Sequence, residues 1–269
     1  MKTVLLVTIS FFTIGLSCWG QETTSHKASV TVLLAKLHST KEPEREEAFE
    51  KLRTNPASLQ SPKVRTALLE LLERENHEND SQLAEAQKKG YPDEGDNEGY
   101  AEYYGDLLGI VDSFADWNDS RQACILAEGA YNDDSAFAAK IVAHAKVTVP
   151  CLLKKSQSPI SMNRAVTVPV LVRVLGEAKG SLDPTTALAA RQIVLRALQD
   201  PDEAVRAFTV VALGTYGAED MIPALRKVAK EDPAPGEDGR SISTSAVEAI
   251  AAIEKRSSKG REPGSHPQN

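Results

Sequence analysis

The residues with the most potential for chemistry are tyrosines and carboxylates gathered in one stretch, residues 91–106. Four of the six tyrosines of the chain lie there, interleaved with acids. The residues that we predict to contact a partner are Tyr91, Tyr100, Tyr103, Tyr104, Asp96 and Glu98. Tyrosine is enriched at binding surfaces because it offers a large contact area at a low entropic cost. The acids favour a basic partner surface; the alternative is a solvated loop whose last tyrosines pack under the next helix.

Metal chemistry would need histidines, cysteines or acids at ligand spacing. Of the five histidines, the one followed by glutamate is His77, and a single His-Glu pair cannot complete a ligand set. A calcium-dependent module that uses the acids of residues 91–106 is a third alternative. It is disfavoured because these acids lack the ligand order of an EF-hand and its terminal bidentate glutamate. No P-loop, dinucleotide-binding or Gly-x-Ser-x-Gly pattern occurs. The sequence therefore predicts no cofactor, no metal site and no catalytic residue.

Two helices joined by a short turn are predicted for residues 200–225. Asp200 and Pro201 are suited to begin a helix, as an N-cap carboxylate followed by proline at the first helical position. Apolar side chains then recur every three or four residues, which is typical of a helix with one buried face. On the first helix these are Val205, Phe208, Thr209, Ala212 and Leu213, and on the second Met221, Ile222, Leu225, Val228 and Ala229.

This stretch closely resembles a HEAT repeat of the short bacterial type, which is also similar to the repeats of phycobilin lyases. The resemblance rests on Asp200, Val205-Arg206, Ala212-Leu213-Gly214 and Ile222-Pro223-x-Leu225. It implies a solenoid in which an acid and an arginine bond between neighbouring repeats, and these would be Asp200 and Arg206. Arg45 and Arg65 open earlier helices with a similar pattern, and we expect them to pair with acids at repeat junctions.

Other parts of the chain repeat features of this unit. Asp183-Pro184 duplicates Asp200-Pro201, and an aliphatic-Pro-x-Leu helix start is predicted at Val149, Val168 and Ile222. No alternating β-branched run bounded by turns occurs. The predicted fold class is all-α, an α-solenoid of stacked HEAT-type helix pairs. It covers residues 28–256 with one long acidic loop insertion at 76–106, and a disordered tail follows at 257–269.

Residues 1–20 have the pattern of a secretory signal peptide. Lys2 precedes an apolar stretch from Val4 to Leu16 that is too short to span a bilayer. Cleavage before Gln21 predicts an exported protein, either periplasmic or secreted. The alternative is a lipid anchor at Cys18 in the outer envelope, although Gly15 stands where a bacterial lipoprotein signal expects leucine.

Charge and cysteine content limit the partners and the compartment. The formal net charge is −7, and removal of residues 1–20 takes away Lys2 alone, which gives −8. An acidic chain repels the phosphates of nucleic acid and anionic lipid, so neither is an expected partner. Cys124 and Cys151 either form one disulfide in an oxidising compartment or are two small buried side chains, and the second interpretation is favoured.

These patterns predict an exported, non-enzymatic scaffold. It would bind a partner protein through the solenoid surface and the loop at residues 91–106. The alternative is a HEAT-fold enzyme, or a protein that handles a chromophore or cofactor in the manner of the bilin lyases. A visible absorption band in the purified protein would favour that alternative.

Overall fold

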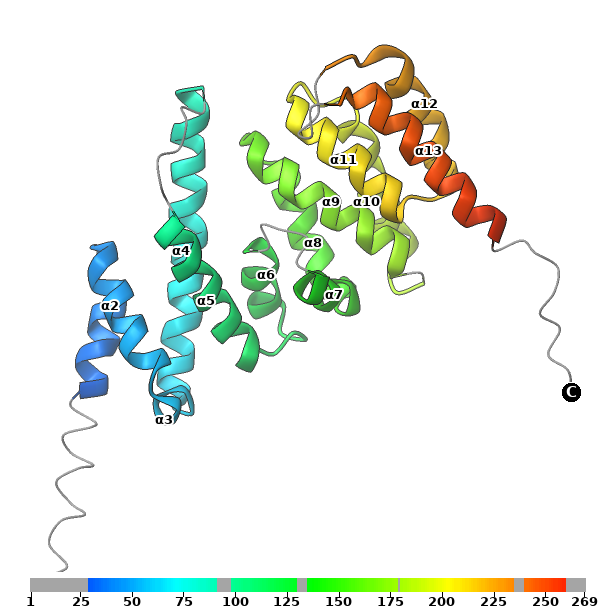
Figure 1. The fold of residues 1–269 in the computed structure, drawn as a ribbon. Helices are drawn as coiled ribbons and strands as arrows, with labels where there is room; N and C mark the ends of the chain where they lie inside the picture. The colour runs from blue at the N-terminus through cyan, green and yellow to red at the C-terminus, as the bar shows by residue number, and fades with distance from the viewer. Residues whose placement is uncertain (1–28, 91–97, 130–134, 179, 235–239, 260–269) are drawn as a thin grey trace, which may run out of the picture. The chain divides into compact units, whose positions relative to one another are not determined.

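A computed structural model describes residues 29–90, 98–129, 135–178, 180–234 and 240–259. The regular elements of these residues are helices, as Figure 1 shows, so the predicted all-α class is confirmed. The chain divides into two compact units, residues 1–67 and residues 68–269. The predicted signal peptide lies outside the described residues.

The first unit consists of short helices. Residues 29–37 are helical, and α2 (Glu42–Arg53) and α3 (Pro56–Leu59) follow before α4 begins at Pro62. Proline begins α3 and α4 without loss, because the first amide of a helix has no intrahelical partner. The fully or almost fully buried side chains of this unit include Leu37, Arg45, Ala48, Phe49, Leu52 and Val64.

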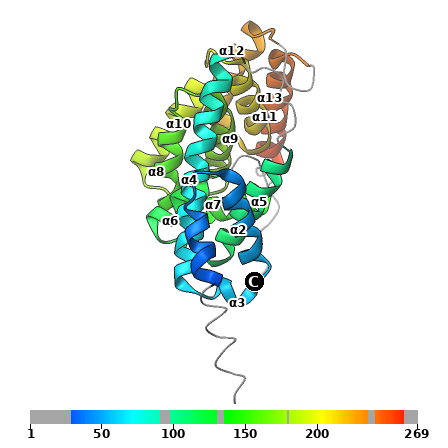
Figure 2. The same ribbon diagram turned by 90° about the vertical axis from the view of Figure 1, so that its left-hand side faces the viewer.

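The second unit continues α4 and adds the remaining helices. Their bounds are α4 (Pro62–Lys88), α5 (Glu98–Phe114), α6 (Ser120–Glu128), α7 (Ser135–Ala143), α8 (Ala145–Lys155), α9 (Ser161–Glu177), α10 (Pro184–Ala197), α11 (Glu203–Tyr216), the 3₁₀ turn η1 (Glu219–Met221), α12 (Ile222–Glu231) and α13 (Ile242–Lys259). The longer helices α9, α11 and α13 lie side by side in chain order. Helix α10 packs on α9, and α8 and α10 are adjacent in both views of the molecule (Figures 1 and 2). This arrangement is the stack of helix pairs expected for a solenoid.

Helices α4 and α5 contradict the long loop predicted for residues 76–106. Helix α4 continues to Lys88, and α5 begins at Glu98. Residues 76–88 contain neither glycine nor proline, and their Glu, Gln, Ala, Leu and Lys residues are good helix formers. The acids in this stretch therefore belong to the polar face of a helix and do not indicate a loop. Helix α13 likewise extends through residues 257–259, which were predicted to be disordered.

Two of the three predicted proline-marked helix starts are wrong. Pro150 and Pro169 lie inside α8 and α9, and Pro223 stands in the first turn of α12 as predicted. A proline inside a helix leaves the carbonyl four residues earlier without its helical donor. Pro150 is exposed, so solvent can reach this part of the helix.

Helices α6 and α8 pack together and are joined by a disulfide between Cys124 and Cys151. The packing brings the two Cα atoms to 5.6 Å, which is within the range that a disulfide requires. The favoured prediction, two unpaired buried side chains, is therefore wrong. The sequence pattern of each helix does not show which residue of the other helix it meets.

Candidate functional site

Two of the tyrosines predicted to contact a partner are buried. Tyr103 and Tyr104 lie in α5, and each is only 7% exposed. The Tyr103 hydroxyl donates to Glu75 Oε1 at 3.1 Å, and the Tyr104 hydroxyl donates to Asn76 Oδ1. Both tyrosines therefore fix α5 on α4, and the prediction that they contact a partner is wrong.

The other predicted contact residues are only partly described. Tyr100 and Glu98 belong to the first turn of α5, and their side chains lie outside the description. Tyr91 and Asp96 fall between α4 and α5, outside the described residues. Their contact with a partner stays a prediction.

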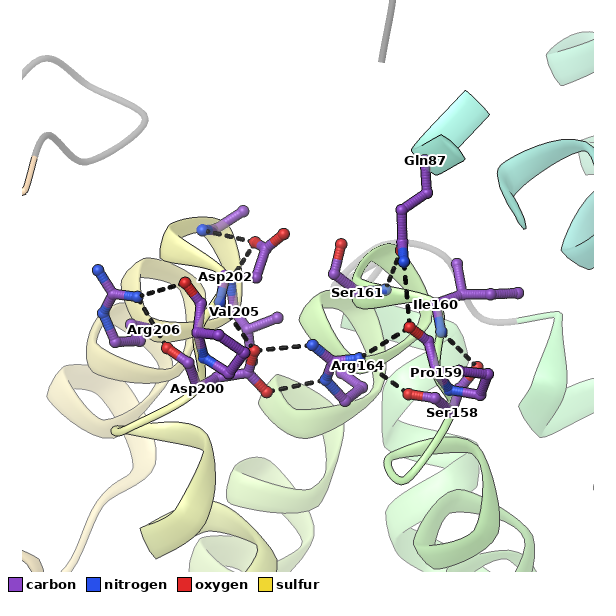
Figure 3. A network of polar contacts seen from close by, with 12 residues as sticks. Gln87, Ser158, Pro159, Ile160, Ser161, Arg164, Asp200, Asp202, Val205 and Arg206 are labelled. Atoms are coloured by element: carbon purple, nitrogen blue, oxygen red, sulfur yellow. Dashed lines mark hydrogen bonds and ion pairs between the residues drawn. The ribbon is translucent and has the colours of Figure 1, made fainter. Parts of the chain in front are cut away.

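The predicted arginine and aspartate residues of the later repeat belong to a ladder, shown in part in Figure 3. Arg164 of α9 donates to Asp200 through Nε–Oδ2 at 2.8 Å and Nη2–Oδ1 at 2.7 Å. Arg206 of α11 pairs in the same two-pronged way with Asp232, at 2.6 and 3.4 Å. Each arginine thus reaches the acid that precedes the next helix of its layer. The term ladder below means Arg164, Asp200, Arg206 and Asp232.

Each ladder arginine also holds the turn before its own helix. Arg164 Nη1 donates to the carbonyls of Ser158 at 2.9 Å and Pro159 at 3.3 Å. Arg206 Nη1 makes the same two bonds to the carbonyls six and five residues before it, at 2.7 and 3.1 Å (Figure 3). The planar guanidinium has five donors in a fixed fork, so one side chain can serve the turn and the acid together.

Asp200 has a different role from the one predicted. The N-cap of α11 is Asp202, whose carboxylate accepts the amide hydrogen of Ala204 at 3.0 Å. The Asp200 carboxylate accepts the amide of Asp202 at 3.0 Å and faces Arg164 (Figure 3). Arg206 therefore bonds to Asp200 through the backbone carbonyl, and its acid partner is Asp232.

Sequence reasoning missed Arg164 and Asp232, although both carry a recognisable signal. Asp232-Pro233 repeats the dipeptide Asp200-Pro201. Arg164 follows Ser158-Pro159 at the same offset of six residues that separates Arg206 from Asp200. The serine or aspartate before proline, with arginine six residues after it, would have identified Arg164, and the repeated Asp-Pro dipeptide would have identified Asp232.

Both ion pairs of the ladder are largely shielded from solvent. The side chains are 17% and 11% exposed in the Arg164–Asp200 pair, and 17% and 15% exposed in the Arg206–Asp232 pair. Burial alone would raise the pKa of Asp200, but the hydrogen bonds from Arg164 and from the Asp202 amide outweigh it. The pKa of Asp200 is therefore lowered from its ordinary value of 3.8, and the carboxylate is ionised at neutral pH.

Arg45 and Arg65 in the first unit make a similar bond to the preceding turn. Arg45 Nη1 donates to the Ser39 carbonyl at 3.2 Å, and Arg65 Nε donates to the Leu59 carbonyl at 2.7 Å. In both cases the acceptor lies six residues before the arginine. Arg65 Nη2 also donates to Gln60 Oε1 at 3.1 Å, and Arg45 is completely buried. The bond from arginine to the carbonyl six residues earlier is thus shared by both units.

Two grooves lie beside the ladder. The first has a volume of about 290 Å³ and lies between the end of α8 and α10; it is lined by Ser156, Gln157, Arg164, Val168, Ile193, Arg196, Ala197, Asp200 and Val205. The second has a volume of about 340 Å³ and lies between the end of α10 and α12; it is lined by Leu198, Gln199, Asp200, Arg206, Ala224, Lys227, Val228, Glu231 and Asp232. Asp200 belongs to both linings, so the two grooves are neighbours at the ladder.

The opposite ends of α9 and α11 border a larger hollow of about 870 Å³. Arg256 of α13 donates there to the carbonyls of Gly217 at 2.9 Å and Leu213 at 3.5 Å, and also to Gly214. The guanidinium of Arg173 lies 5.4 Å from the centre of the Tyr216 ring. Here arginine contacts helix-end carbonyls and an aromatic ring.

The described residues include no group of three or more His, Cys, Asp or Glu side chains placed to hold a metal ion. His77 and Glu78 line an open groove of about 530 Å³ along α4. Within the described helices, none is long and apolar enough to cross a membrane by itself. The bent pair Ala136–Ala143 and Ala145–Lys155 meets the criteria of length and composition.

Comparison with known proteins agrees with the helix packing. Residues 167–255 match the family model of HEAT repeats. The match includes Asp200, Arg206 and Asp232 of the ladder, and it ends within α13. A search of curated proteins found no match. The matched repeats and the stacked helix pairs show that residues 167–255 of this chain are HEAT repeats.

Proposed function

We propose that this protein is a non-enzymatic scaffold that binds a partner protein on the surface of its HEAT repeats. The ladder is the observation that carries the proposal. It fixes α9, α11 and the turn after α12 to one another through shielded, two-pronged ion pairs. A surface that is rigid before binding loses little conformational entropy when a partner docks. HEAT repeats commonly mediate contacts between proteins, which also supports this function.

The state of the groove carboxylates supports a role without catalysis. A general acid or base works best when its pKa lies near the working pH. The pKa of Asp200 is shifted the other way, below 3.8, by its hydrogen bonds. Asp232 is likewise engaged by Arg206, with Nε–Oδ2 at 2.6 Å. These carboxylates are therefore better suited to holding helices together than to transferring protons.

Affinity capture with blocked grooves tests the scaffold function. The purified protein would be immobilised and exposed to the envelope fraction of the native host, and retained proteins identified by mass spectrometry. Gln157→Trp with Ala224→Trp fills both grooves, whereas Val211→Trp adds the same bulk at a position on α11 that is 60% exposed and outside both linings. We expect a partner retained by the wild type and by Val211→Trp but lost by the groove variant.

Two outcomes would contradict the scaffold function. One is the absence of any protein retained above the level of an inert matrix. The other is a purified protein with a visible absorption band from a bound chromophore, which would favour the alternative related to the bilin lyases. Circular dichroism of each variant shows whether the fold is intact.

We also propose that the protein is exported, to the periplasm or out of the cell. The disulfide between Cys124 and Cys151 supports this location, since disulfides persist in oxidising compartments and are rare in the cytosol. Mass spectrometry of protein from the native host should find an N-terminus at Gln21 and both cysteines resistant to thiol labelling. A lipid on Cys18 would indicate a membrane anchor, and an intact Met1 in the cytosolic fraction would contradict export.

A further inference from the structure

Three helices of this acidic chain have an unusual charge composition. Helices α8 and α10 contain neither aspartate nor glutamate, and the acid of α12 is Glu231. The same helices carry Lys146, Lys154, Lys155, Arg191, Arg196, Arg226, Lys227 and Lys230. The net charge of −7 is therefore carried by other elements, and these helices are strongly basic.

Some of these cations are engaged within the fold. Lys155 is buried and donates to the carbonyl of Glu128. Arg191 pairs with Asp220, and Arg226 lies 3.6 Å from the carboxylate of Glu254. Five others are exposed, and the described part of the chain gives them no ion pair; they are Lys146, Lys154, Arg196, Lys227 and Lys230.

Two of these exposed cations line the grooves, and two others lie close to lining residues in the sequence. Arg196 lines the groove between α8 and α10, and Lys227 lines the groove between α10 and α12. Lys154 and Lys230 lie in the last turns of α8 and α12, two residues before Ser156 and one residue before Glu231, which line the same grooves. Of the three acids that line the grooves, Asp200 and Asp232 are paired with the ladder arginines, and Glu231 of α12 is the third. Arg196 and Lys227 thus bring positive charge to the grooves from α10 and α12, and Lys154 and Lys230 add charge at the ends of α8 and α12. These four residues are called the basic strip below.

We propose that the two neighbouring grooves bind an extended acidic segment of the partner protein. Carboxylates of the segment would meet Lys154, Arg196, Lys227 and Lys230. The apolar lining residues give its aliphatic parts a surface to cover; they are Val168, Ile193, Val205, Ala224 and Val228. Two grooves that are neighbours at Asp200 suit an extended chain better than a compact domain. This inference rests on the proposed scaffold function and reverses the basic partner surface predicted from residues 91–106.

The surroundings of the grooves favour a short acidic peptide over nucleic acid or a membrane. Gln87 near the end of α4 accepts the amide of Ser161 at 2.7 Å and donates to the Pro159 carbonyl at 3.2 Å, close to the first groove (Figure 3). Helix α4 also brings an acid to this end of the basic strip, because Asp80 lies 3.8 Å from Lys155 of α8 and accepts a hydrogen bond from Asn163 at 3.0 Å. Charges separated by more than about 8 Å hardly affect each other at physiological ionic strength. A short peptide can stay at the cations of the basic strip, whereas a long polyanion would also pass close to the acid of α4 and be repelled by it.

The test is fluorescence anisotropy with the full chain and a fluorescein-labelled oligo-glutamate peptide. We expect saturable binding that weakens as the ionic strength rises from about 0.01 to 0.15 M, because the Debye length then falls from about 30 to 8 Å. Arg196→Glu with Lys227→Glu should weaken binding about tenfold, since two attractive contacts become repulsive. The matched control is Lys255→Glu with Lys259→Glu, which changes the net charge equally at exposed positions of α13. The control should bind like the wild type.

Several outcomes would overturn the inference. Oligo-glutamate without measurable binding would do so, as would an equal loss in the groove and control variants. Tighter binding of a single-stranded DNA oligonucleotide or of phosphatidylserine vesicles would assign the strip to a phosphate-bearing ligand. A captured protein partner that binds the Arg196→Glu/Lys227→Glu variant normally would leave the scaffold function intact and refute the acidic segment. Failure of capture by the wild type, with oligo-glutamate still bound, would refute the scaffold function alone.

Discussion

The two ends of helices α9 and α11 use arginine in different ways. At the ladder end, Arg164 and Arg206 each join an acid and the preceding turn, with the same atoms in the same order. At the opposite end, Arg256 contacts helix-terminal carbonyls and Arg173 lies over the Tyr216 ring. The first arrangement occurs twice in neighbouring repeats, and the second combines contacts that differ from one another.

This difference separates contacts that recur in each repeat from contacts that occur at one place in this protein. A contact between each repeat and the next can be used again wherever the motif recurs, so its contribution grows with the number of interfaces. Arg256 instead places positive charge at the C-terminal end of α11, which is favourable for the helix dipole but belongs to one site. The ladder end is therefore expected to be stiff, and the hollow at the other end more tolerant of change.

The strongest test of the ladder is Arg206→Ala. The change removes the guanidinium from two carbonyls and from the Asp232 carboxylate, which keeps the Ala234 amide as a donor, and we expect it to lower the free energy of unfolding by about 3 kcal/mol. Arg206→Lys should recover little, since a single ammonium cannot reproduce the fork. Urea unfolding followed by circular dichroism measures both. The matched control is Arg226→Ala, which removes an exposed pair at 3.6 Å and should cost less than about 1 kcal/mol. Equal losses in the two variants would remove the distinction between ladder and surface.

The close approach of α9 and α11 at the hollow is tested by Gly176→Ala. A Cβ atom there would lie 2.4 Å from the Tyr216 carbonyl oxygen, so the two helices must separate. We expect a loss of about 2 kcal/mol in the same measurement. Gly109→Ala is the control, because its Cβ would meet nothing within 4 Å and alanine favours a helix interior by about 0.5–1 kcal/mol. A neutral Gly176→Ala variant would show that this end is looser than its geometry indicates.

The charge of the ladder is tested by Asp200→Asn at low pH. The pKa of Asp200 in the folded protein is below 3.8, so its carboxylate stabilises the fold above pH 3.8 and loses that contribution as the pH falls through the lowered value. The free energy of unfolding of the wild type should exceed that of the variant by about 1–2 kcal/mol near neutral pH. This difference should shrink below pH 3.8. Thermal melts across this range measure it. A difference that does not depend on pH would assign the effect to shape and not to charge.

The smallest effect is expected for Arg256→Ala at the opposite end. Its hydrogen bonds go to carbonyls that water can also reach, so the loss should be about 1 kcal/mol. Hydrogen exchange should show faster opening of the last turn of α11, with the ladder end unchanged. A loss as large as that of Arg206→Ala would mean that both ends stabilise the stack equally.

The sequence predicted α11 well because its signals are local. Val205, Thr209, Ala212 and Leu213 are buried, as their spacing predicts. The residues next to Asp200 and Asp202 in the sequence do not show that Asp202, and not Asp200, caps the helix. Asp200 is drawn to Arg164, which lies 36 residues earlier, and Asp202 is left to cap the helix.

The error at residues 76–106 has a similar origin. Acids and glycines made the stretch resemble a loop, and tyrosines made it resemble a contact surface. The burial of Tyr103 and Tyr104 depends on Glu75 and Asn76 on another helix, 28 residues away in each case. Polar partners that are buried together give no hydrophobic pattern, so the sequence did not predict this packing.

The disulfide of α6 and α8 has a mechanical consequence. Each repeat contacts its neighbours, so a force that pulls on residue 259 would detach α13, then α11 and then α9, one interface at a time. The bond between Cys124 and Cys151 is covalent, and extension between these two residues stops there while the bond is oxidised. The helices from α9 onward can therefore be extended by force, whereas the segment between Cys124 and Cys151 cannot be extended beyond its disulfide. A reducing agent would break the disulfide, and the segment between the two cysteines could then also extend under the same force.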